Sequence, residues 1–323
     1  MTDNFLIKRI TWSDFQLTTP ILLQDANGPC PLLALVNTML LQHEYIGKRA
    51  PDDPKLQQVD QFRENLLRKG NEIQLTDLLT LIGNLLVELA KYDEYAADFV
   101  PKVLDLLPRL HTGRDVNPNL ISGTFPTVDL SSELFTRVFS LQFRHAWVLD
   151  EDIEIIRQLQ TFDRLQDFLL ENNNSGTDFD EAKQVRSWLE KKKSQITEVG
   201  IEKLNESLAA NEFAIFFRNN HFNTLIKDPD GKLYLLITAS AFSNKKDLIW
   251  QSLLGTDGSD DIFFTGNFFP TLDDDLADLE NQEVVDNDDV SLVKRLQEEE
   301  DLIMAQQLHL LYQKPKKNQK LKK

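Results

Sequence analysis

The order of secondary-structure signals along the chain limits its fold more than any other feature of the sequence. Residues 56–110 carry leucine and isoleucine at helical spacing, and further helices are predicted for residues 151–210. Residues 212–218, 222–227 and 232–238 are instead rich in aromatic and branched side chains, which favour strands. Helices in one part of a chain and strands in another are typical of an α+β fold. We therefore predict a helix-rich first part packed on an antiparallel sheet.

Shorter signals complete this prediction. Residues 5–12 and 21–24 read as extended pieces. The turn signal at residues 27–31 runs directly into an apolar stretch at residues 32–41, which predicts a helix with a proline at its first position. A strand is expected around residues 145–149, at the end of an irregular region.

The distribution of charge divides the chain into four parts. Residues 271–301 hold thirteen acidic residues against two basic ones, and the last ten residues hold six lysines and no acid. We predict a globular domain over residues 1–270 and a disordered acidic linker over residues 271–287. A helix is predicted over residues 288–313, followed by a basic tail at 314–323, which is most simply a solvated end.

Composition excludes several classes of protein. The chain has no apolar run of the roughly 20 residues that a membrane span needs, and its start has no long apolar stretch. A net charge of −17 argues against a nucleic-acid surface. The single cysteine rules out an intrachain disulfide and favours a reducing compartment, the cytoplasm or the nucleus. Scattered histidines make a metal site unfavourable, and no cofactor is expected.

The single cysteine, Cys30, has the placement of a nucleophile. It lies at the start of the predicted apolar helix, where unpaired N–H groups and the helix dipole stabilise a thiolate. Gln24 lies six positions earlier, where its amide could donate to an oxyanion beside the Cys30 backbone N–H. The alternative is a small buried cysteine without chemistry, which its position alone leaves equally open.

A cysteine nucleophile needs a histidine from elsewhere in the chain. Among five histidines we choose His221, because it begins a predicted central strand of the sheet against which the helix after Cys30 is expected to pack. The alternative, favoured by this context alone, is a histidine whose hydrogen bonds are satisfied within the sheet.

Two long motifs resemble one known family. Residues 24–35 (QDANGPCPLLAL) and 216–222 (FFRNNHF) are similar to the paired signatures of the MINDY deubiquitinases, which are cysteine proteases that favour lysine-48-linked polyubiquitin. Residues 107–110, 112–117 and 147–150 resemble further family blocks in the same order. The resemblance covers roughly residues 5–270 and implies a papain-like deubiquitinase domain with ubiquitin and polyubiquitin chains as partners.

The resemblance also implies roles for individual residues. Cys30 is expected as the nucleophile, His221 as the general base and Gln24 as the oxyanion donor. Three apolar positions match family residues that face ubiquitin, although their sequence context alone would assign them to the core: Val116, Trp147 and Phe217.

One departure from the family concerns the group that orients His221. The family commonly continues its later strand with Thr-Asp, whereas here Thr238 is followed by Ala239 and Ser240. The orienting group is therefore unidentified from sequence. An alternative function stays open, that of a catalytically weak or inactive receptor that holds ubiquitin chains.

The tail contains a repeat. An acid, two apolar residues and a leucine recur after twelve positions, beginning at residues 289 and 301. On a helix each copy forms a narrow apolar stripe edged by acids, similar to motif-interacting-with-ubiquitin (MIU) helices. The expected ubiquitin contacts are Leu292, Leu296, Met304, Ala305 and Leu308. Val293 is bulkier than the small residue expected in the first copy, and an acidic coiled-coil or docking helix is the alternative.

Overall fold

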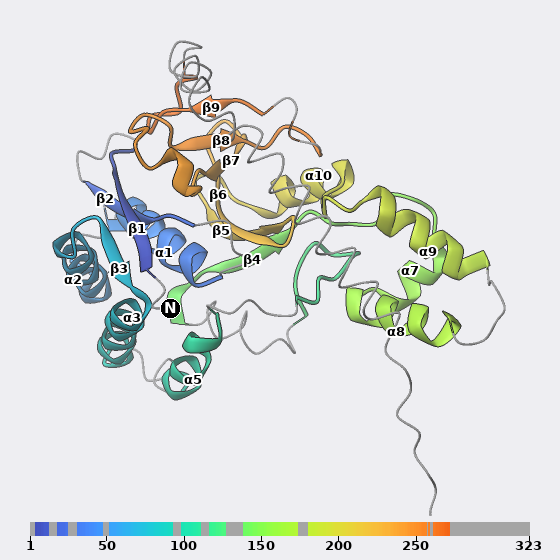
Figure 1. The fold of residues 1–323 in the computed structure, drawn as a ribbon, viewed down its shortest axis with the longest axis horizontal. Coiled ribbons are helices and arrows are strands. Elements are labelled where there is room, and N and C mark those ends of the chain that lie inside the picture. The colour runs from blue at the N-terminus through green and yellow to red at the C-terminus, as the bar shows by residue number, and fades with distance from the viewer. Residues whose placement is uncertain are drawn as a thin grey trace, which may run out of the picture.

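The computed structural model describes most of the first 271 residues. The described ranges are 4–12, 18–24, 31–47, 52–92, 98–110, 116–126, 138–173, 180–256, 258 and 261–271. They contain helices and two sheets, a three-stranded sheet of order β2-β1-β3 and a six-stranded sheet of order β4-β5-β6-β7-β8-β9 (Figure 1). The prediction of an α+β fold is confirmed.

The strands and helices of the described ranges have the following bounds. The strands are β1 (Asn4–Ile10), β2 (Thr19–Leu22), β3 (Glu72–Gln74), β4 (Gln142–His145), β5 (Phe213–Arg218), β6 (His221–Lys227), β7 (Leu233–Leu236), β8 (Trp250–Ser252) and β9 (Phe263–Phe264). The helices are α1 (Pro31–Gly47), α2 (Pro54–Arg68), α3 (Leu75–Ala90), α5 (Val100–Leu110), α7 (Glu154–Leu159), α8 (Phe162–Asn173), α9 (Asp180–Lys191) and α10 (Glu198–Ser207).

The larger sheet differs from the prediction in two respects. It is mixed, because β4 pairs with β5 in parallel while the other pairs are antiparallel. The strand expected at residues 145–149 lies earlier, at Gln142–His145, because Ala146 forms only an isolated bridge with Ile196 and the chain then continues into the helical region. The short strands β3, β8 and β9 were not predicted, since two or three residues carry no periodic pattern.

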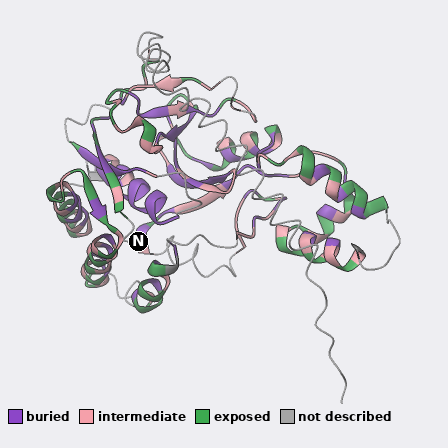
Figure 2. Ribbon diagram, in the orientation of Figure 1, coloured by how far each residue is buried: buried purple, intermediate pink, exposed green. Residues whose placement is uncertain are grey.

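Helix α1 is the centre of the fold. It begins at Pro31, as predicted, and its first eleven residues, 31–41, are all buried. Figure 2 shows this burial, which is typical of a helix that is apolar on nearly every side. Helix α1 contacts β5 and β6 as well as β2, α2 and α5. Thr38 meets Thr224 of β6 through their hydroxyl groups, 2.9 Å apart. These contacts fix the start of α1 relative to the larger sheet.

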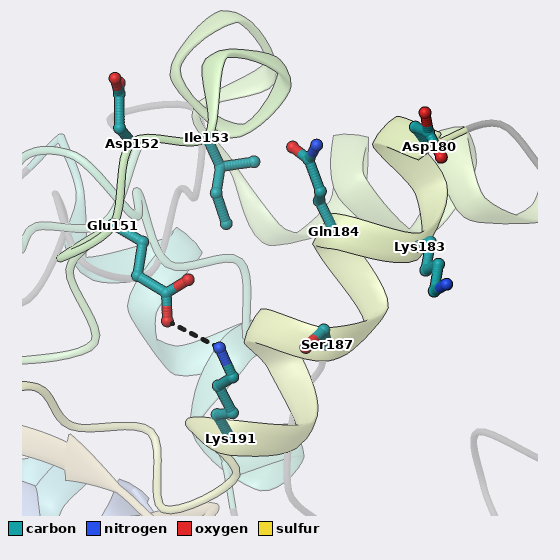
Figure 3. Close-up of a pocket in the computed structure, with 8 residues that line it drawn as sticks. All are labelled: Glu151, Asp152, Ile153, Asp180, Lys183, Gln184, Ser187 and Lys191. Atoms are coloured by element: carbon teal, nitrogen blue, oxygen red, sulfur yellow. Dashed lines mark hydrogen bonds and ion pairs between the residues drawn. The ribbon is translucent and has the colours of Figure 1, made fainter.

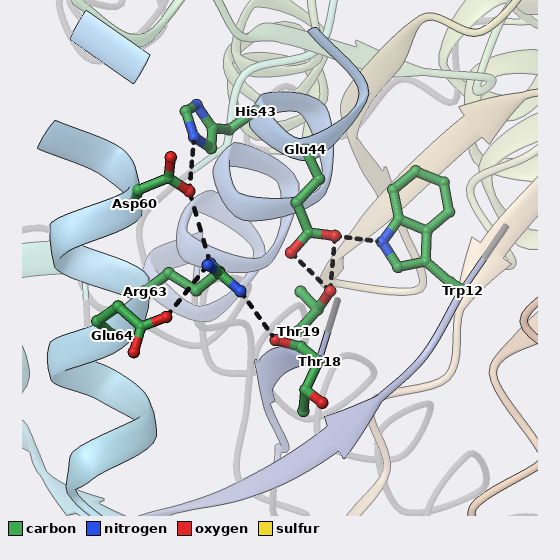
Figure 4. Close-up of polar contacts among 8 residues, drawn as sticks. All are labelled: Trp12, Thr18, Thr19, His43, Glu44, Asp60, Arg63 and Glu64. Atoms are coloured by element: carbon green, nitrogen blue, oxygen red, sulfur yellow. Dashed lines mark hydrogen bonds and ion pairs between the residues drawn. The ribbon is translucent and has the colours of Figure 1, made fainter. Parts of the chain in front are cut away.

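A polar cluster fixes the other half of α1 (Figure 4). Glu44 accepts hydrogen bonds from Trp12 Nε1 at 2.7 Å and from Thr19 Oγ1 at 2.6 Å. Burial raises the pKa of the Glu44 carboxyl group, and the two donors oppose that shift. Beside it, His43 of α1 lies 3.4 Å from Asp60 of α2. The cluster ties α1 to the first two strands and to α2.

Helices α7, α8 and α9 form a lobe beside the main body (Figure 1). Its core contains Trp147 and Trp188, which stack with ring centroids 5.9 Å apart. One face of the lobe carries an open depression with a mixed-charge lining, across which Glu151 and Lys191 pair at 3.3 Å (Figure 3). Its lining residues include neither histidine nor cysteine. Within the described ranges, no helix is long and apolar enough to cross a membrane.

His145 should make the stability of the fold depend on pH. Its Nε2 lies 3.1 Å from the Thr124 carbonyl oxygen, and its Nδ1 accepts from the Trp147 backbone N–H at 3.2 Å, so the neutral ring is satisfied. Burial lowers the pKa of His145 to about 4.

In the unfolded chain His145 binds a proton near pH 6.5, whereas in the folded chain it binds one only near pH 4. The contribution of the buried, neutral His145 ring to the free energy of unfolding is therefore complete above pH 6.5. It is lost as the pH falls from 6.5 to about 4, by about 3 kcal/mol in all. Urea unfolding at pH 7 and pH 5 should show this loss. The variant His145→Gln, whose amide does not titrate, should flatten the pH dependence, and equal slopes for parent and variant would contradict the assignment.

Candidate active site

His221 is the first residue of β6, in the middle of the larger sheet. It lies opposite Arg218 in the β5–β6 register, so Asn219 and Asn220 alone form the connecting loop. Both asparagines have positive φ, +49° and +57°, as the central residues of a type I′ hairpin turn require. Asparagine tolerates this conformation better than other residues with a side chain. The turn therefore places the His221 ring at one end of the central strands.

Gln24 lies where the two sheets meet. Its backbone N–H donates to the Thr238 carbonyl at 2.7 Å, and its own carbonyl accepts from the Ser240 N–H at 3.1 Å. Asn37 of α1 anchors Leu22, two positions before Gln24, by accepting from its N–H at 2.8 Å and donating to its carbonyl at 2.9 Å. Gln24 is thus held by the helix that follows Cys30 in sequence and by the strand segment that follows β7.

The side chains of Gln24 and His221 are in contact. Gln24 Nε2 lies 3.3 Å from His221 Nδ1, although the two residues are 197 positions apart in the chain. Because an amide nitrogen only donates, this contact requires the tautomer in which Nδ1 carries no proton. The structure therefore joins the two residues that the sequence assigned to oxyanion stabilisation and to base catalysis.

The first residues of β6, including His221, are not paired with β7. The two strands pair over Leu225–Leu235, Ile226–Tyr234 and Lys227–Leu233. Three residues after the end of β7, Ala239 forms a parallel bridge with Gln24. The chain thus pairs with β6 along β7 and with Gln24 after β7 ends. This pairing places Gln24 next to the start of β6, so its amide reaches His221.

Cys30 lies outside the described residues. The description resumes at Pro31, the first residue of α1. Since α1 contacts both β5 and β6, the chain after Cys30 enters the fold against the strands that carry the His221 hairpin. The role of Cys30 as nucleophile stays a prediction.

Ala239, the departure from the family pattern, lies next to Gln24 in the bridge that separates β6 from β7. A methyl side chain cannot orient a histidine ring, whereas the Gln24 amide contacts that ring directly. In the described ranges, His, Cys, Asp and Glu side chains form no group of three or more suited to a metal ion.

The three positions expected to face ubiquitin lie in different surroundings. Trp147 and Phe217 are each only 3% exposed, the first stacked on Trp188 and the second in the core around α1. Val116 is partly buried against the same core. This packing favours a structural role for Trp147 and Phe217, and contact with ubiquitin stays a prediction for all three.

The predicted tail also lies outside the described residues, which end at residue 271. This holds for the acidic linker from residue 272 onward, for the basic tail and for the five expected ubiquitin contacts: Leu292, Leu296, Met304, Ala305 and Leu308.

Comparison with known proteins decides the family. The family model for MINDY deubiquitinases matches residues 3–268. This chain belongs to the MINDY deubiquitinase family. The prediction of a cysteine-type deubiquitinase, made from the two motifs around Cys30 and His221, is confirmed at the level of the family.

Several known proteins are similar to this chain over long stretches. Ubiquitin carboxyl-terminal hydrolase MIY1 of Saccharomyces cerevisiae is 34% identical over 265 residues, which cover 77% of this chain and 68% of that protein. The uncharacterized protein YGL082W of the same yeast is 27% identical over 350 residues, covering 94% of this chain and 86% of the relative. Ubiquitin carboxyl-terminal hydrolase MINDY-1 of Mus musculus is 28% identical over 277 residues, 82% of this chain and 54% of its own length. This chain therefore spans about half of MINDY-1.

One residue near the site escaped the sequence analysis. Asn37 is fully buried and satisfies both backbone groups of Leu22, two positions before Gln24. The signal was present, because Asn37 and Thr38 are the polar pair in the otherwise apolar stretch at residues 32–41. A buried polar pair in such a helix requires specific partners.

Proposed function

We propose that this protein hydrolyses isopeptide bonds in polyubiquitin, with Cys30 as nucleophile, His221 as general base and Gln24 as oxyanion donor. The observation that carries this proposal is the 3.3 Å contact between Gln24 Nε2 and His221 Nδ1. It unites two motifs from opposite ends of a MINDY-family domain, beside a helix whose first residue directly follows Cys30.

The chemistry follows from these roles. His221 takes the proton of the Cys30 thiol, and the resulting thiolate, favoured by the helix N-terminus, attacks the carbonyl carbon of ubiquitin's last residue. The carbonyl electron pair moves onto oxygen, and the oxyanion accepts hydrogen bonds from Gln24 Nε2 and the Cys30 N–H. When the intermediate collapses, the C–N bond breaks and His221 gives its proton to the departing lysine amine. Water, deprotonated by His221, then hydrolyses the thioester and returns the thiolate.

We assign this site to the papain-like class of thiol proteases. A buried helix preceded by the nucleophile packs against a sheet whose central strand begins with the histidine. The glutamine precedes the cysteine in sequence and contacts the histidine in space. These relations support a papain-like arrangement around α1, β5 and β6.

We further propose a preference for lysine-48-linked chains. Its support is the resemblance of residues 24–35 and 216–222 to a family with that preference. The test is cleavage of di-ubiquitin and longer chains of every linkage type at equal concentration, with fastest loss of lysine-48-linked substrate expected. Equal rates for all linkages would remove this part of the proposal.

A receptor that holds ubiquitin without cleaving it is the second candidate. The methyl side chain of Ala239, where the family commonly has an acid, favours it. Reaction with ubiquitin that carries an electrophile at its C-terminus separates the two functions, because a thiolate reacts and an inert cysteine does not. Labelling of the folded protein at neutral pH supports the hydrolase, and its absence supports the receptor.

We propose that residues 288–313 form a ubiquitin-binding helix with two MIU-like stripes. The similarity to YGL082W covers more of this chain than the family match does, so it continues past residue 268. On one continuous helix the second stripe is displaced by about 18 Å and about 120° from the first. Two linked ubiquitins on different faces would then bind more tightly than free ubiquitin.

The variant Ala305→Asp should weaken binding of long chains and leave the labelling of Cys30 by a mono-ubiquitin probe almost unchanged. The charge enters the second apolar stripe, and the catalytic domain is untouched. Gln306→Asp, which adds the same charge on the opposite side of the predicted helix, is the matched control. Chain affinity and probe labelling are measured on both variants. Equal binding by Ala305→Asp and parent would show that the stripe does not contribute, and a comparable loss of labelling would place the helix in the catalytic core.

A further inference from the structure

The hairpin turn that precedes His221 is held by a buried glutamine from another part of the chain. Gln195 Oε1 accepts from the Asn220 backbone N–H at 2.7 Å, and Gln195 Nε2 donates to Asn220 Oδ1 at 2.9 Å. Gln195 is only 3% exposed and itself has a positive φ of +55°. One side chain therefore binds both the backbone and the side chain of the residue immediately before His221.

The segment that carries Gln195 is rigidly placed. The next residue, Ile196, bridges Ala146 after the end of β4, and the N–H of Thr197 donates to the Ala146 carbonyl at 2.9 Å. Thr197 also caps α10, with its hydroxyl accepting from the Gly200 N–H at 3.0 Å. A Cβ at Gly200 would come within 1.8 Å of the Ala146 oxygen, so the backbone of α10 directly contacts the residue that follows β4.

The turn needs such support. Both asparagines, Asn219 and Asn220, hold left-handed backbone conformations, which are disfavoured for residues that carry a Cβ. The Gln195 side chain is hydrogen-bonded to Asn220 in this turn conformation and therefore stabilises the turn relative to its alternatives. His221 follows without an intervening residue, so the direction of its Cα–Cβ bond is set by the turn.

We propose that Gln195 is a positioning residue for His221, acting through the Asn220 turn and without contact with substrate. This inference rests on the proposed role of His221 as general base. Gln24 contacts the imidazole ring at Nδ1, and Gln195 holds the backbone from which the ring projects. Together they provide the orientation that a carboxylate would give at Ala239.

The test compares Gln195→Leu with parent in the reaction of an electrophilic mono-ubiquitin probe. The first-order rate at saturating probe should fall by about 10- to 100-fold, because small displacements of a catalytic group cost this much. The probe concentration at half-saturation should not change, since Gln195 does not meet ubiquitin. Gln184→Leu, the same substitution at an exposed glutamine of α9 (Figure 3), is the matched control and should react like parent.

A conservative variant separates positioning from simple stability. Gln195→Glu keeps an acceptor for the Asn220 N–H, and rotation of the Asn220 amide presents its NH₂ group to the second oxygen. Its rate should stay within about threefold of parent, because both hydrogen bonds survive. A loss in Gln195→Glu as large as that in Gln195→Leu would overturn the proposal.

A second readout is independent of activity. NMR of the imidazole nitrogens, with the His221 signals identified by their absence in His221→Ala, should show one tautomer in parent and an averaged mixture in Gln195→Leu. Unchanged signals together with an unchanged rate would overturn the inference. If parent does not react with the probe at all, the proposed hydrolase function fails, and the NMR comparison alone then decides whether Gln195 positions His221.

If Gln195→Leu does not fold, Asn220→Gly replaces it in both measurements. Glycine keeps the left-handed turn and the backbone bond to Gln195, and removes only the Oδ1 contact. A slower probe reaction with mixed tautomers supports the proposal, and behaviour identical to parent overturns it.

Discussion

Replacing Cys30 by alanine should abolish reaction with electrophilic ubiquitin, and replacing His221 by alanine should slow chain cleavage by about 10²- to 10⁴-fold. The first change removes the only thiol in the sequence, so no other residue can form the thioether. The second removes the ring that contacts Gln24 and leaves the thiol without its base. Rates of probe labelling and of chain hydrolysis measure the two effects.

Both variants should bind ubiquitin chains with parental affinity and unfold at nearly the parental temperature. His221 is only partly buried at the start of β6, so its loss leaves no cavity in the core. His43→Gln, at a histidine of α1 that lies 3.4 Å from Asp60, is the matched control and should remain active. Cleavage by His221→Ala at the parental rate would reject the assigned base.

Gln24→Ala should lower kcat by about 10²- to 10³-fold, the effect of removing one oxyanion donor, with KM nearly unchanged. Its structural bonds to Thr238 and Ser240 use the backbone alone and survive the substitution. The melting temperature should therefore change little. Chain cleavage kinetics and thermal unfolding are measured on the same preparation.

Gln24→Glu sharpens this test, because a carboxylate of the same size cannot donate a hydrogen bond to an oxyanion. It should lose as much activity as Gln24→Ala. A change confined to KM would reject the role of Gln24 as oxyanion donor. A joint fall in activity and melting temperature would instead assign Gln24 to structural packing.

The sequence predicted the elements that depend on local patterns. Pro31 begins α1 as expected, because a proline at the first helical position lacks only an N–H that would be unpaired there. Strands β6 and β7 lie at the residues predicted as strands, 222–227 and 232–238, each to within two residues at either end. His221 lies on a central strand, because the aromatic and branched residues around it favour one.

The features that escaped prediction depend on partners distant in sequence. Strand β3 exists because Ile73 pairs with Phe5, and a three-residue segment shows no period of its own. Residues 24 and 221 were each assigned a role, but their contact depends on the exchange of partner after β7, which no spacing encodes. Gln195 lay in a region predicted as helical, where nothing marked it as a partner of the His221 turn.

Contacts between residues far apart in the sequence determine when this domain can fold during protein synthesis. Lys8 in β1 donates to the Leu248 carbonyl across 240 positions, and Gln24 is held by residues 238 and 240. The ribosome releases the N-terminal segment long before these later residues emerge, and contacts of such sequence separation form slowly. The segment that carries Gln24 must therefore wait for residues 238–248, so a growing chain can form the proposed catalytic site only after these residues have left the exit tunnel. A nascent deubiquitinase of this architecture is thus expected to be inactive toward ubiquitin on neighbouring proteins until the segment that pairs with Gln24 has emerged from the ribosome.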